Sequence, residues 1–295
     1  MGCDPGPPPL TGTHRPGILA LLLLLGSAYA TGWWRLSRRA PQLVGWWRPL
    51  LTLAGLGSVA LALLSPLDAL AHRRFAAHMV QHMLLVAVAA PALLLADPLA
   101  ALLWALPARA RVRAGRLLVR GAPVRRVWQT LTRMPVAWLS YAGVLWLWHL
   151  PWAYEPALGD RLLHDLEHLA FFTSAILFWW PVVSPAPHFA RSVHPVLRVV
   201  YLVTGALQNA ALGLLLAASP RVLYPSYAAS PEPGTLSPLD DQALGGVVMW
   251  AFSGAVDMLA VILLLHQFFQ AADREALGPT TTERHGRSRD TAPLP

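Results

Sequence analysis

Residues 76–96 read AAHMVQHMLLVAVAAPALLLA, an apolar stretch that carries His78 and His82 near its start. A helix needs about 20 mostly apolar residues to cross the hydrocarbon core of a bilayer, so this stretch predicts a membrane-spanning helix. The same criterion finds further spans along the chain, and the full set covers approximately residues 16–34, 46–66, 76–96, 135–154, 162–183, 196–218 and 245–270. We therefore expect an all-α integral membrane protein, a bundle of seven transmembrane helices.

The overall composition agrees with a membrane protein and excludes several other classes. Of the 295 residues, 55% are hydrophobic and 13% are charged, whereas an ordinary globular domain is about 25% charged. Such a chain cannot cover a soluble surface with polar groups, and it is too apolar to be disordered. The single cysteine, Cys3, excludes a disulfide framework and a cysteine-based metal cluster.

The arginines alternate between the two sides of the predicted bundle. Eighteen of the 23 basic residues fall in the loops 35–48, 97–134 and 184–198 or in the tail after residue 270. Because positive residues stay in the cytoplasm, we expect the N-terminus outside and the C-terminus in the cytoplasm. The net charge of +8 is thus a topology signal and predicts no nucleic-acid partner.

These boundaries divide the chain into a transmembrane domain over residues 16–270 and two polar ends. Residues 1–15 predict a disordered extracytoplasmic N-terminus, and residues 271–295 predict a disordered cytoplasmic tail. The apolar segment 98–107 is too short to span the bilayer and is predicted to lie at its interface. An alternative is signal-peptide cleavage after Ala28-Tyr29-Ala30, which would leave six spans, but the arginine asymmetry argues against it.

Histidines gather at the outer end of the predicted bundle. His78 and His82 are i and i+4 in the third span, and the fifth span repeats that spacing. Residues at i and i+4 share a helix face, and a polar group inside a membrane requires a partner or a function. Because imidazole suits copper, zinc and iron, we predict a metal site with ligands drawn from His78, His82, His149, His164 and His168.

Other interpretations of the histidines stay open at the level of sequence. They can be structural residues at the headgroup level, or two of them can hold haem b as axial ligands. They can also line the vestibule of a copper or proton transporter that uses Asp257 deeper in the membrane. Met79 and Met83 form another i, i+4 pair whose thioethers suit Cu(I), although packing is the commoner role of buried methionine.

Several motifs resemble those of the CtaG-type assembly factors of caa3-type cytochrome c oxidase. Their order and spacing match from about residue 43 to residue 270. The motifs are Leu64-Ser65-Pro66-Leu67-Asp68, His78-Met79-Val80-Gln81-His82, Trp148-His149-Leu150-Pro151, His164 to His168 followed by Phe178-Trp179-Trp180-Pro181, and Ser237-Pro238 with Asp241-Gln242 and Gly245-Gly246.

The resemblance implies a multi-pass, non-enzymatic protein of the bacterial plasma membrane that is needed to assemble a haem–copper oxidase. Its implied partners are cytochrome c oxidase subunits and the lipid bilayer, and its implied cargo is copper. The family's recurrent polar positions fall here on Asp68, His78, Gln81, His82, His149, His164, Glu167, His168, Asp241 and Gln242. Around the ligands we expect Asp68, His72, Met79, Gln81, Met83, Glu167, Asp241 and Gln242.

Overall fold

A computed structural model describes residues 15–43, 45–119, 121–185, 193–228 and 236–277. These residues form helices and short connections, and none of them lies in a β-strand. The elements, in chain order, are α1 (Pro16–Arg39), η1 (Pro41–Leu43), α2 (Arg48–Leu64), α3 (Pro66–Ala71), α4 (Phe75–Met83), η2 (Leu84–Ala89), α5 (Ala90–Ala96), α6 (Pro98–Ala105), α7 (Ala108–Leu118), α8 (Pro123–Leu131), α9 (Met134–Trp148), α10 (Pro151–Gly159), α11 (Arg161–Val183), α12 (Pro195–Ala217), η3 (Pro225–Tyr227) and α13 (Pro238–Leu277).

The helix lengths agree with a helical membrane protein. Within the described residues, five helices are long and apolar enough to cross a bilayer. Two of the predicted spans coincide with shorter apolar helices, α2 with 17 residues and α9 with 15 residues. Proline explains both short lengths, because Pro66 follows the end of α2 and Pro151 follows the end of α9. A count of seven spans and the orientation of the termini therefore remain predictions.

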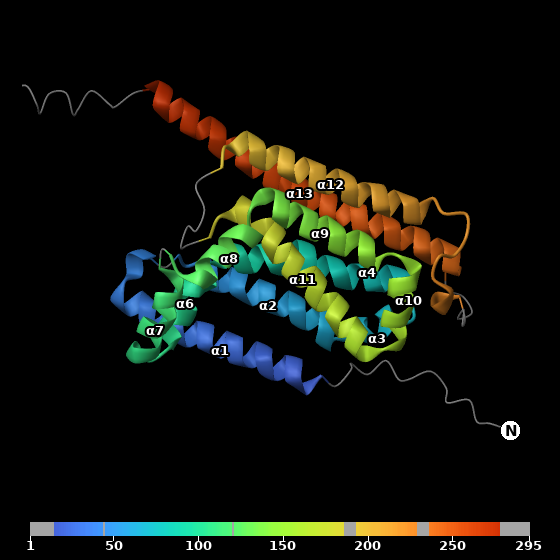
Figure 1. The fold of residues 1–295 in the computed structure, drawn as a ribbon, viewed down its shortest axis with the longest axis horizontal. Coiled ribbons are helices and arrows are strands. Elements are labelled where there is room, and N and C mark those ends of the chain that lie inside the picture. Colours follow the sequence, from blue (N-terminus) through green and yellow to red (C-terminus); the bar gives the residue numbers. More distant parts are fainter. Residues whose placement is uncertain (1–14, 44, 120, 186–192, 229–235, 278–295) are drawn as a thin grey trace, which may run out of the picture.

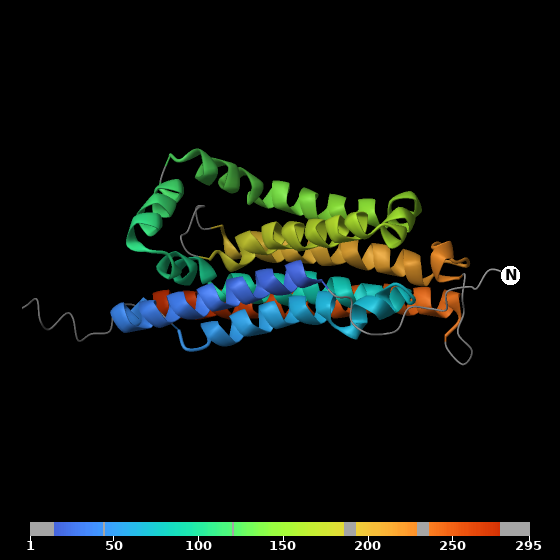
Figure 2. The ribbon, with the colours of Figure 1, turned by 90° about the horizontal axis from the view of Figure 1, so that it is seen from below.

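The long helices lie side by side along one axis of the molecule (Figures 1 and 2). The short helices α3 and α10 lie at one end of this bundle, hereafter the α3–α10 end. The short helices α6, α7 and α8 gather at the opposite end, hereafter the α6–α8 end. The two ends therefore differ in character, since α7 and α8 carry six arginines, at positions 109, 111, 113, 116, 125 and 126.

The continuous helix of α4, η2 and α5 is the centre of the bundle. It packs against α2, α3, α11 and α13. In its most apolar stretch of 18 residues, 67% of the residues are buried, compared with 11% in the corresponding stretch of α1. Because α1 is so exposed and so rich in leucine, that helix presents its apolar side chains to lipid. Groups on α4 are instead shielded from lipid on several sides.

The η2 segment is a π-helical turn in the middle of this central helix. Pro91 follows it and has no N–H, so it cannot complete the α-helical hydrogen bond to the residue four positions earlier. That bond would have gone to the carbonyl of Ala87. Two other carbonyls of the turn accept side-chain hydrogen bonds: Ser58 Oγ donates to Leu84 at 2.8 Å, and Trp179 Nε1 donates to Val86 at 3.1 Å. The turn therefore ties the central helix to α2 and α11 just beyond His82.

The observed boundaries differ from the predicted ones at two places. Helix α13 continues past the predicted end of the last span at residue 270 to Leu277, so the predicted tail begins within a helix. The sequence reason is that Gly278 and Pro279 are the first helix-ending residues there. Residue 15, assigned to the disordered N-terminus, is a buried arginine. Residues 1–14 and 278–295 lie outside the described residues.

Helices α12 and α13 approach closely at a pair of glycines, which yields a stability prediction. A Cβ on Gly246 would lie against the carbonyl oxygen of Gly213 and 2.9 Å from the backbone nitrogen of Ala217. Since backbone atoms cannot move aside cheaply, we expect Gly246→Ala to lower the free energy of unfolding by about 1–3 kcal/mol. Thermal unfolding of the detergent-purified protein measures this effect. Gly254→Ala is the matched control, because its new Cβ meets no described atom within 4 Å.

Candidate metal centre

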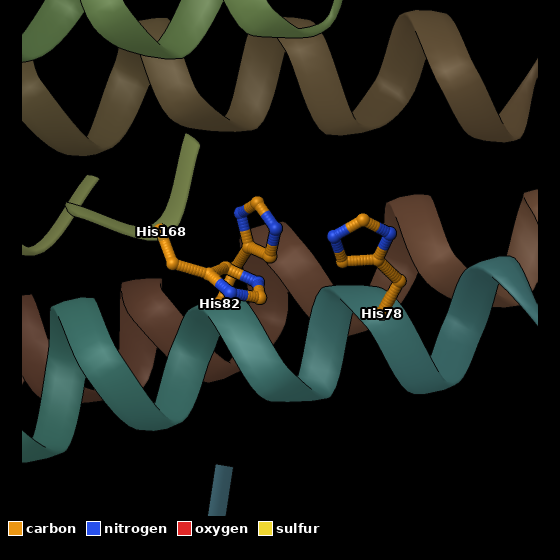
Figure 3. Close-up of side chains that lie close together, drawn as sticks. All are labelled: His78, His82 and His168. Carbon is orange, nitrogen blue, oxygen red and sulfur yellow. The ribbon is translucent and has the colours of Figure 1, made fainter. Parts of the chain in front are cut away.

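Two helices bring the paired histidines face to face at the α3–α10 end. His78 and His82 lie one turn apart on α4, and His168 reaches toward them from α11 (Figure 3). His164 lies one turn from His168 on the same helix. All four side chains are buried, with at most 3% of their surface exposed. Because α4 is the central helix and α11 packs beside it, neither pair faces lipid.

The four imidazole rings touch one another directly. Ring centroids are 4.4 Å apart for His78 and His82 and 4.3 Å apart for His164 and His168. Across the helix interface the separations are 5.1 Å from His78 to His164 and 5.2 Å from His82 to His168. The sequence prediction that these two pairs form one cluster therefore agrees with the geometry.

The potential ligand atoms fall into two overlapping groups. One consists of His78, His82 and His168, and the other of His78, His164 and Glu167; within each group the ligand atoms lie within 4.8 Å of one another. Glu167 was expected only around the ligands, but its Oε2 lies 3.8 Å from His78 Nε2 and its Oε1 lies 3.7 Å from His82 Nε2. The signal for this placement was available in the sequence, because Glu167 follows His164 at i+3 on the same helix face.

The cluster has buried polar atoms that form no hydrogen bonds. They are His78 Nε2, both ring nitrogens of His82, His164 and His168, and both carboxylate oxygens of Glu167. Buried polar atoms are nearly always paired, so a concentration of unpaired ones requires an explanation. A metal ion would use these lone pairs, and imidazole with carboxylate is a donor set that suits copper or zinc. The residues present therefore fit a transition-metal ion.

His149 lies at the edge of the cluster rather than inside it. Its ring centroid is 6.4 Å from that of His82, and it belongs to neither ligand group among the described residues. Its Nδ1 donates a hydrogen bond to the carbonyl oxygen of Leu145 at 2.7 Å. A carbonyl can only accept, so the proton lies on Nδ1 and the buried Nε2 keeps a free lone pair. His149 thus offers a ligand atom at a greater distance than the four central histidines.

Two tyrosines form a hydrogen-bond chain to His78. Tyr154 Oη lies 2.8 Å from His78 Nδ1 and 3.0 Å from Tyr227 Oη. Tyr227 Oη also lies 3.0 Å from His78 Nδ1, and it donates to the carbonyl oxygen of Ala71 at 3.1 Å. Burial raises the pKa of Tyr227 well above its ordinary value, so its hydroxyl keeps the proton that it donates.

The end of this chain determines its direction. Because the Ala71 carbonyl only accepts, Tyr227 donates to it, and Tyr154 can then donate to Tyr227. With the hydroxyl hydrogens of Tyr154 and Tyr227 used in this way, the remaining bond is one that His78 Nδ1–H donates to the Tyr154 hydroxyl. The lone pair of His78 then lies on Nε2, which faces Glu167 and the other potential ligands. A metal-binding histidine normally donates its other N–H in this way.

Asp241 and Gln242 position the elements of the site without entering the cluster. Asp241 Oδ2 accepts a hydrogen bond of 2.6 Å from the backbone N–H of Phe75, which is the first residue of α4. Gln242 accepts from the backbone N–H of Leu223 at 2.7 Å and donates to the carbonyl oxygens of Leu216 and Arg221. Asp241 therefore caps the helix that carries His78, and Gln242 holds the connection that leads to Tyr227.

Asp68 and Gln81 belong to a polar network on the α2 side of α4. Gln81 Nε2 donates to Asp68 Oδ1 at 2.9 Å and to the carbonyl oxygen of Ala62 at 2.7 Å. Arg15 forms ion pairs with Asp68, at 3.2 Å, and with Asp165 on α11. The network therefore joins α1, α3, α4 and α11 beside the cluster. The sequence did not indicate this role of Arg15, because a basic residue before an apolar stretch is typical of a residue that sets membrane topology.

The two methionines lie in the apolar core. Met79 is fully buried, and its Cγ lies 3.2 Å from where a Cβ on Gly245 of α13 would be. Met83 belongs to the same apolar cluster. Sequence reasoning also missed Tyr154 and Tyr227, which lie in α10 and η3 between the long helices. No helical period relates these tyrosines to the histidines, so no sequence signal could have placed them at the cluster.

Comparison with known proteins identifies one related family. A family model described as "cytochrome c oxidase caa3 assembly factor" matches residues 27–271. A search of curated proteins and a search of solved structures both found no match. The matched range covers most of the chain and includes every residue of the histidine cluster.

Proposed function

The chain belongs to the caa3-type cytochrome c oxidase assembly factor family, and on that premise we propose that it binds a copper ion at the histidine cluster and delivers it to an oxidase subunit. Copper is here a cargo, held by His78, His82, His164 and His168 with Glu167 beside them. The protein makes and breaks no covalent bond of a substrate in this role, so it is not an enzyme.

The observation that carries the proposal is the set of buried, unpaired nitrogens. Three histidines, His78, His82 and His168, bring ligand atoms within 4.8 Å of one another, and a fourth, His149, adds a free Nε2 at the edge. Within the described residues the cluster contains imidazole and carboxylate but no thiolate. Thiolates hold Cu(I) most strongly, so this donor set suits an ion that must be released to a partner.

The proposed topology places the cluster on the side from which copper is inserted. We propose seven spans, made by the five long helices together with α2 and α9, in a bacterial plasma membrane. The arginines of α7 and α8 then lie in the cytoplasm. The α3–α10 end, with the N-terminus of α1 and the cluster, faces the outside.

The packing of the rings favours an ion over haem b. A haem held by two axial histidines lies with its flat macrocycle between their rings, so the two rings cannot be in direct contact. In the cluster the rings of His82 and His168 are 5.2 Å apart, and those of His78 and His82 are 4.4 Å apart. A macrocycle between His82 and His168 would have to push α4 and α11 apart, whereas a single ion needs only ligand atoms that lie close together, as those of the cluster do.

The transporter interpretation relies on Asp257, whose contacts are those of a structural residue. Asp257 Oδ2 accepts a hydrogen bond from Ser253 at 3.4 Å, and Ser253 accepts one from Asn209 of α12 at 2.7 Å. Hydrogen bonds between membrane helices stabilise their association by about 1 kcal/mol each. The bond from Asn209 to Ser253 therefore supports the α12–α13 interface. Asp257 joins this group through Ser253 of its own helix, which favours a structural role for Asp257 over a role in transport.

Metal analysis with an absorbance spectrum tests the proposal. Protein purified in detergent after growth with copper and haem is expected to contain copper near one equivalent and to show no Soret band. A Soret band would support haem b instead. If a control copper protein loads under the same conditions and this one does not, the histidines are not a copper site.

The hydrogen-bond chain leads to a prediction for Tyr227→Phe. Without the Tyr227 hydroxyl, Tyr154 loses its acceptor and donates to His78 Nδ1, which moves the imidazole proton to Nε2. Loss of such a supporting hydrogen bond weakens metal affinity by about 10–100-fold, and we expect that loss in a competition titration against a Cu(I) chelator. Tyr224→Phe is the matched control, because Tyr224 donates to the carbonyl oxygen of His149 and not to a ring nitrogen. Equal affinities in both variants would contradict the assigned direction of the chain.

A further inference from the structure

One exposed histidine lies in contact with the buried cluster. His72 ends α3 at the α3–α10 end and is exposed, whereas His164 is 1% exposed. The ring centroids of these two histidines are 4.8 Å apart. Among the described residues, no other exposed histidine has a ring contact with the cluster. His72 is therefore the place where the row of imidazoles reaches the surface.

The hydrogen bonding of His72 leaves a ligand atom free. Its Nδ1 lies 2.9 Å from the carbonyl oxygen of Asp68. That carbonyl can only accept, so Nδ1 carries the proton and Nε2 keeps its lone pair. His72 thus has the same arrangement as His149 and His78, with one nitrogen anchored to the protein and the other free for a metal.

The rings form a continuous series from the surface into the bundle. From His72 the series passes to His164 at 4.8 Å, to His168 at 4.3 Å, to His82 at 5.2 Å and then to His149 at 6.4 Å. His78 lies beside this series, 5.1 Å from His164 and 4.4 Å from His82. These distances join ring centroids, and they show that each imidazole of the series has the next one as its neighbour.

Buried aromatic side chains surround the inner part of the series. Phe171 lies against His82 with ring centroids 4.3 Å apart, and Tyr154 lies 5.3 Å from His78. Both aromatic side chains are fully buried. A bare ion has no favourable position in such surroundings except on the nitrogens, so movement along the rings is the low-energy route to the buried positions.

From this series we infer that His72 is the exchange port for copper, and that the ion moves between the surface and the buried cluster by ligand exchange through His164. The inference rests on the proposed function and adds the route and its first ligand. Each step forms one copper–nitrogen bond and breaks another, with no change in oxidation state. Because each step is reversible, the port accelerates release to a partner as much as uptake. It changes the rates of exchange and leaves the equilibrium affinity unchanged.

The test measures rates and affinity separately for His72→Leu. Cu(I) is supplied from a weak chelator to follow uptake and removed by a strong chelator to follow release, both by stopped-flow absorbance on the full chain in detergent. We expect both rates to fall about tenfold, the change that an added barrier of about 1.4 kcal/mol produces. The dissociation constant from competition is expected to stay unchanged. His72→Met keeps a soft ligand for Cu(I) at the port and is expected to retain most of the wild-type rate.

The control and the contrary outcomes are distinct from those of the proposed function. His266→Leu removes another exposed histidine, on α13 and outside the series, and should change neither rate. If the wild-type protein loads copper and His72→Leu loads it at the same rate, His72 is not the exchange port, whereas the proposed copper site is unaffected. If His72→Leu weakens affinity without slowing uptake, His72 is a ligand of the resting ion and the port is again wrong. If wild-type protein binds no copper, the proposed function itself fails.

Discussion

The double variant His82→Ala/His168→Ala is expected to retain no copper through purification while the protein still folds and inserts. These two residues are the deeper members of the two pairs, and with His78 they form one of the two potential ligand groups. Their removal leaves His78 as the one imidazole of that group. The second group, His78, His164 and Glu167, keeps two imidazoles and a carboxylate, and we expect this smaller set to hold copper too weakly for the ion to survive purification. Copper content of the purified variant by elemental analysis measures the loss.

The fold should tolerate this change because the variant removes buried polar atoms that have no hydrogen-bond partners. All four ring nitrogens of His82 and His168 lack a hydrogen-bond partner. The change to alanine therefore removes the packing contacts of the two rings but breaks no hydrogen bond. The cost is a cavity, on the order of 2–5 kcal/mol per large-to-small change. For that reason His82→Leu/His168→Leu is a second variant that fills the volume and removes the ligands. Normal membrane yield with absent copper is the expected result for it.

His266→Ala, on the exposed surface of α13, is the matched control for both double variants. In cells, the double variants should reduce the activity of the copper-dependent oxidase, whereas the control should match the wild type. Oxidase activity that survives in a double variant with normal yield would contradict copper delivery. Retained copper in the purified leucine variant would contradict the assigned ligands.

Replacement of Arg15 by methionine is expected to destabilise the bundle by about 3–5 kcal/mol, the usual cost of removing one partner of a buried ion pair. The Arg15 side chain is 4% exposed, and its partner Asp68 is completely buried. Without the guanidinium, the Asp68 carboxylate keeps its bond from Gln81 but loses its ion pair with Arg15. Helicity during titration with a denaturing detergent measures the change in stability.

Two further variants separate charge from packing at this ion pair. Arg15→Met/Asp68→Asn removes the buried carboxylate as well, and we expect it to recover more than half of the lost stability. Arg161→Met removes an exposed arginine at the start of α11 and should have almost no effect. If Arg15→Met and the wild type are equally stable, the ion pair between Arg15 and Asp68 does not stabilise the bundle, and the prediction is wrong. Since Asp68 also bonds Gln81 on α4, we expect the destabilised variant to bind copper less well.

The sequence alone determined that this is a helical membrane protein, and that His78 pairs with His82 and His164 with His168 one helical turn apart. Apolar length and composition are local properties, so residues 76–96 and 162–183 could be recognised as long helices without knowledge of their neighbours. The i, i+4 spacing of His78 with His82 is local in the same sense, because one helical turn fixes it. The sequence overestimated the length of α2 and α9 and ended α13 early, since apolar composition predicts a span better than it predicts a boundary.

Only the tertiary structure decided how the cluster is completed. His78 and Tyr227 are separated by 149 positions in the chain, and their hydrogen bond exists because η3 folds back over the end of α4. The same holds for Asp241, which caps α4 from another helix, and for the contact between His72 and His164. Such contacts depend on which helix faces pack together and on the relative depth of the helices. Interactions between segments that are distant in the chain determine the packed faces and the depths, and a local pattern of residues encodes neither.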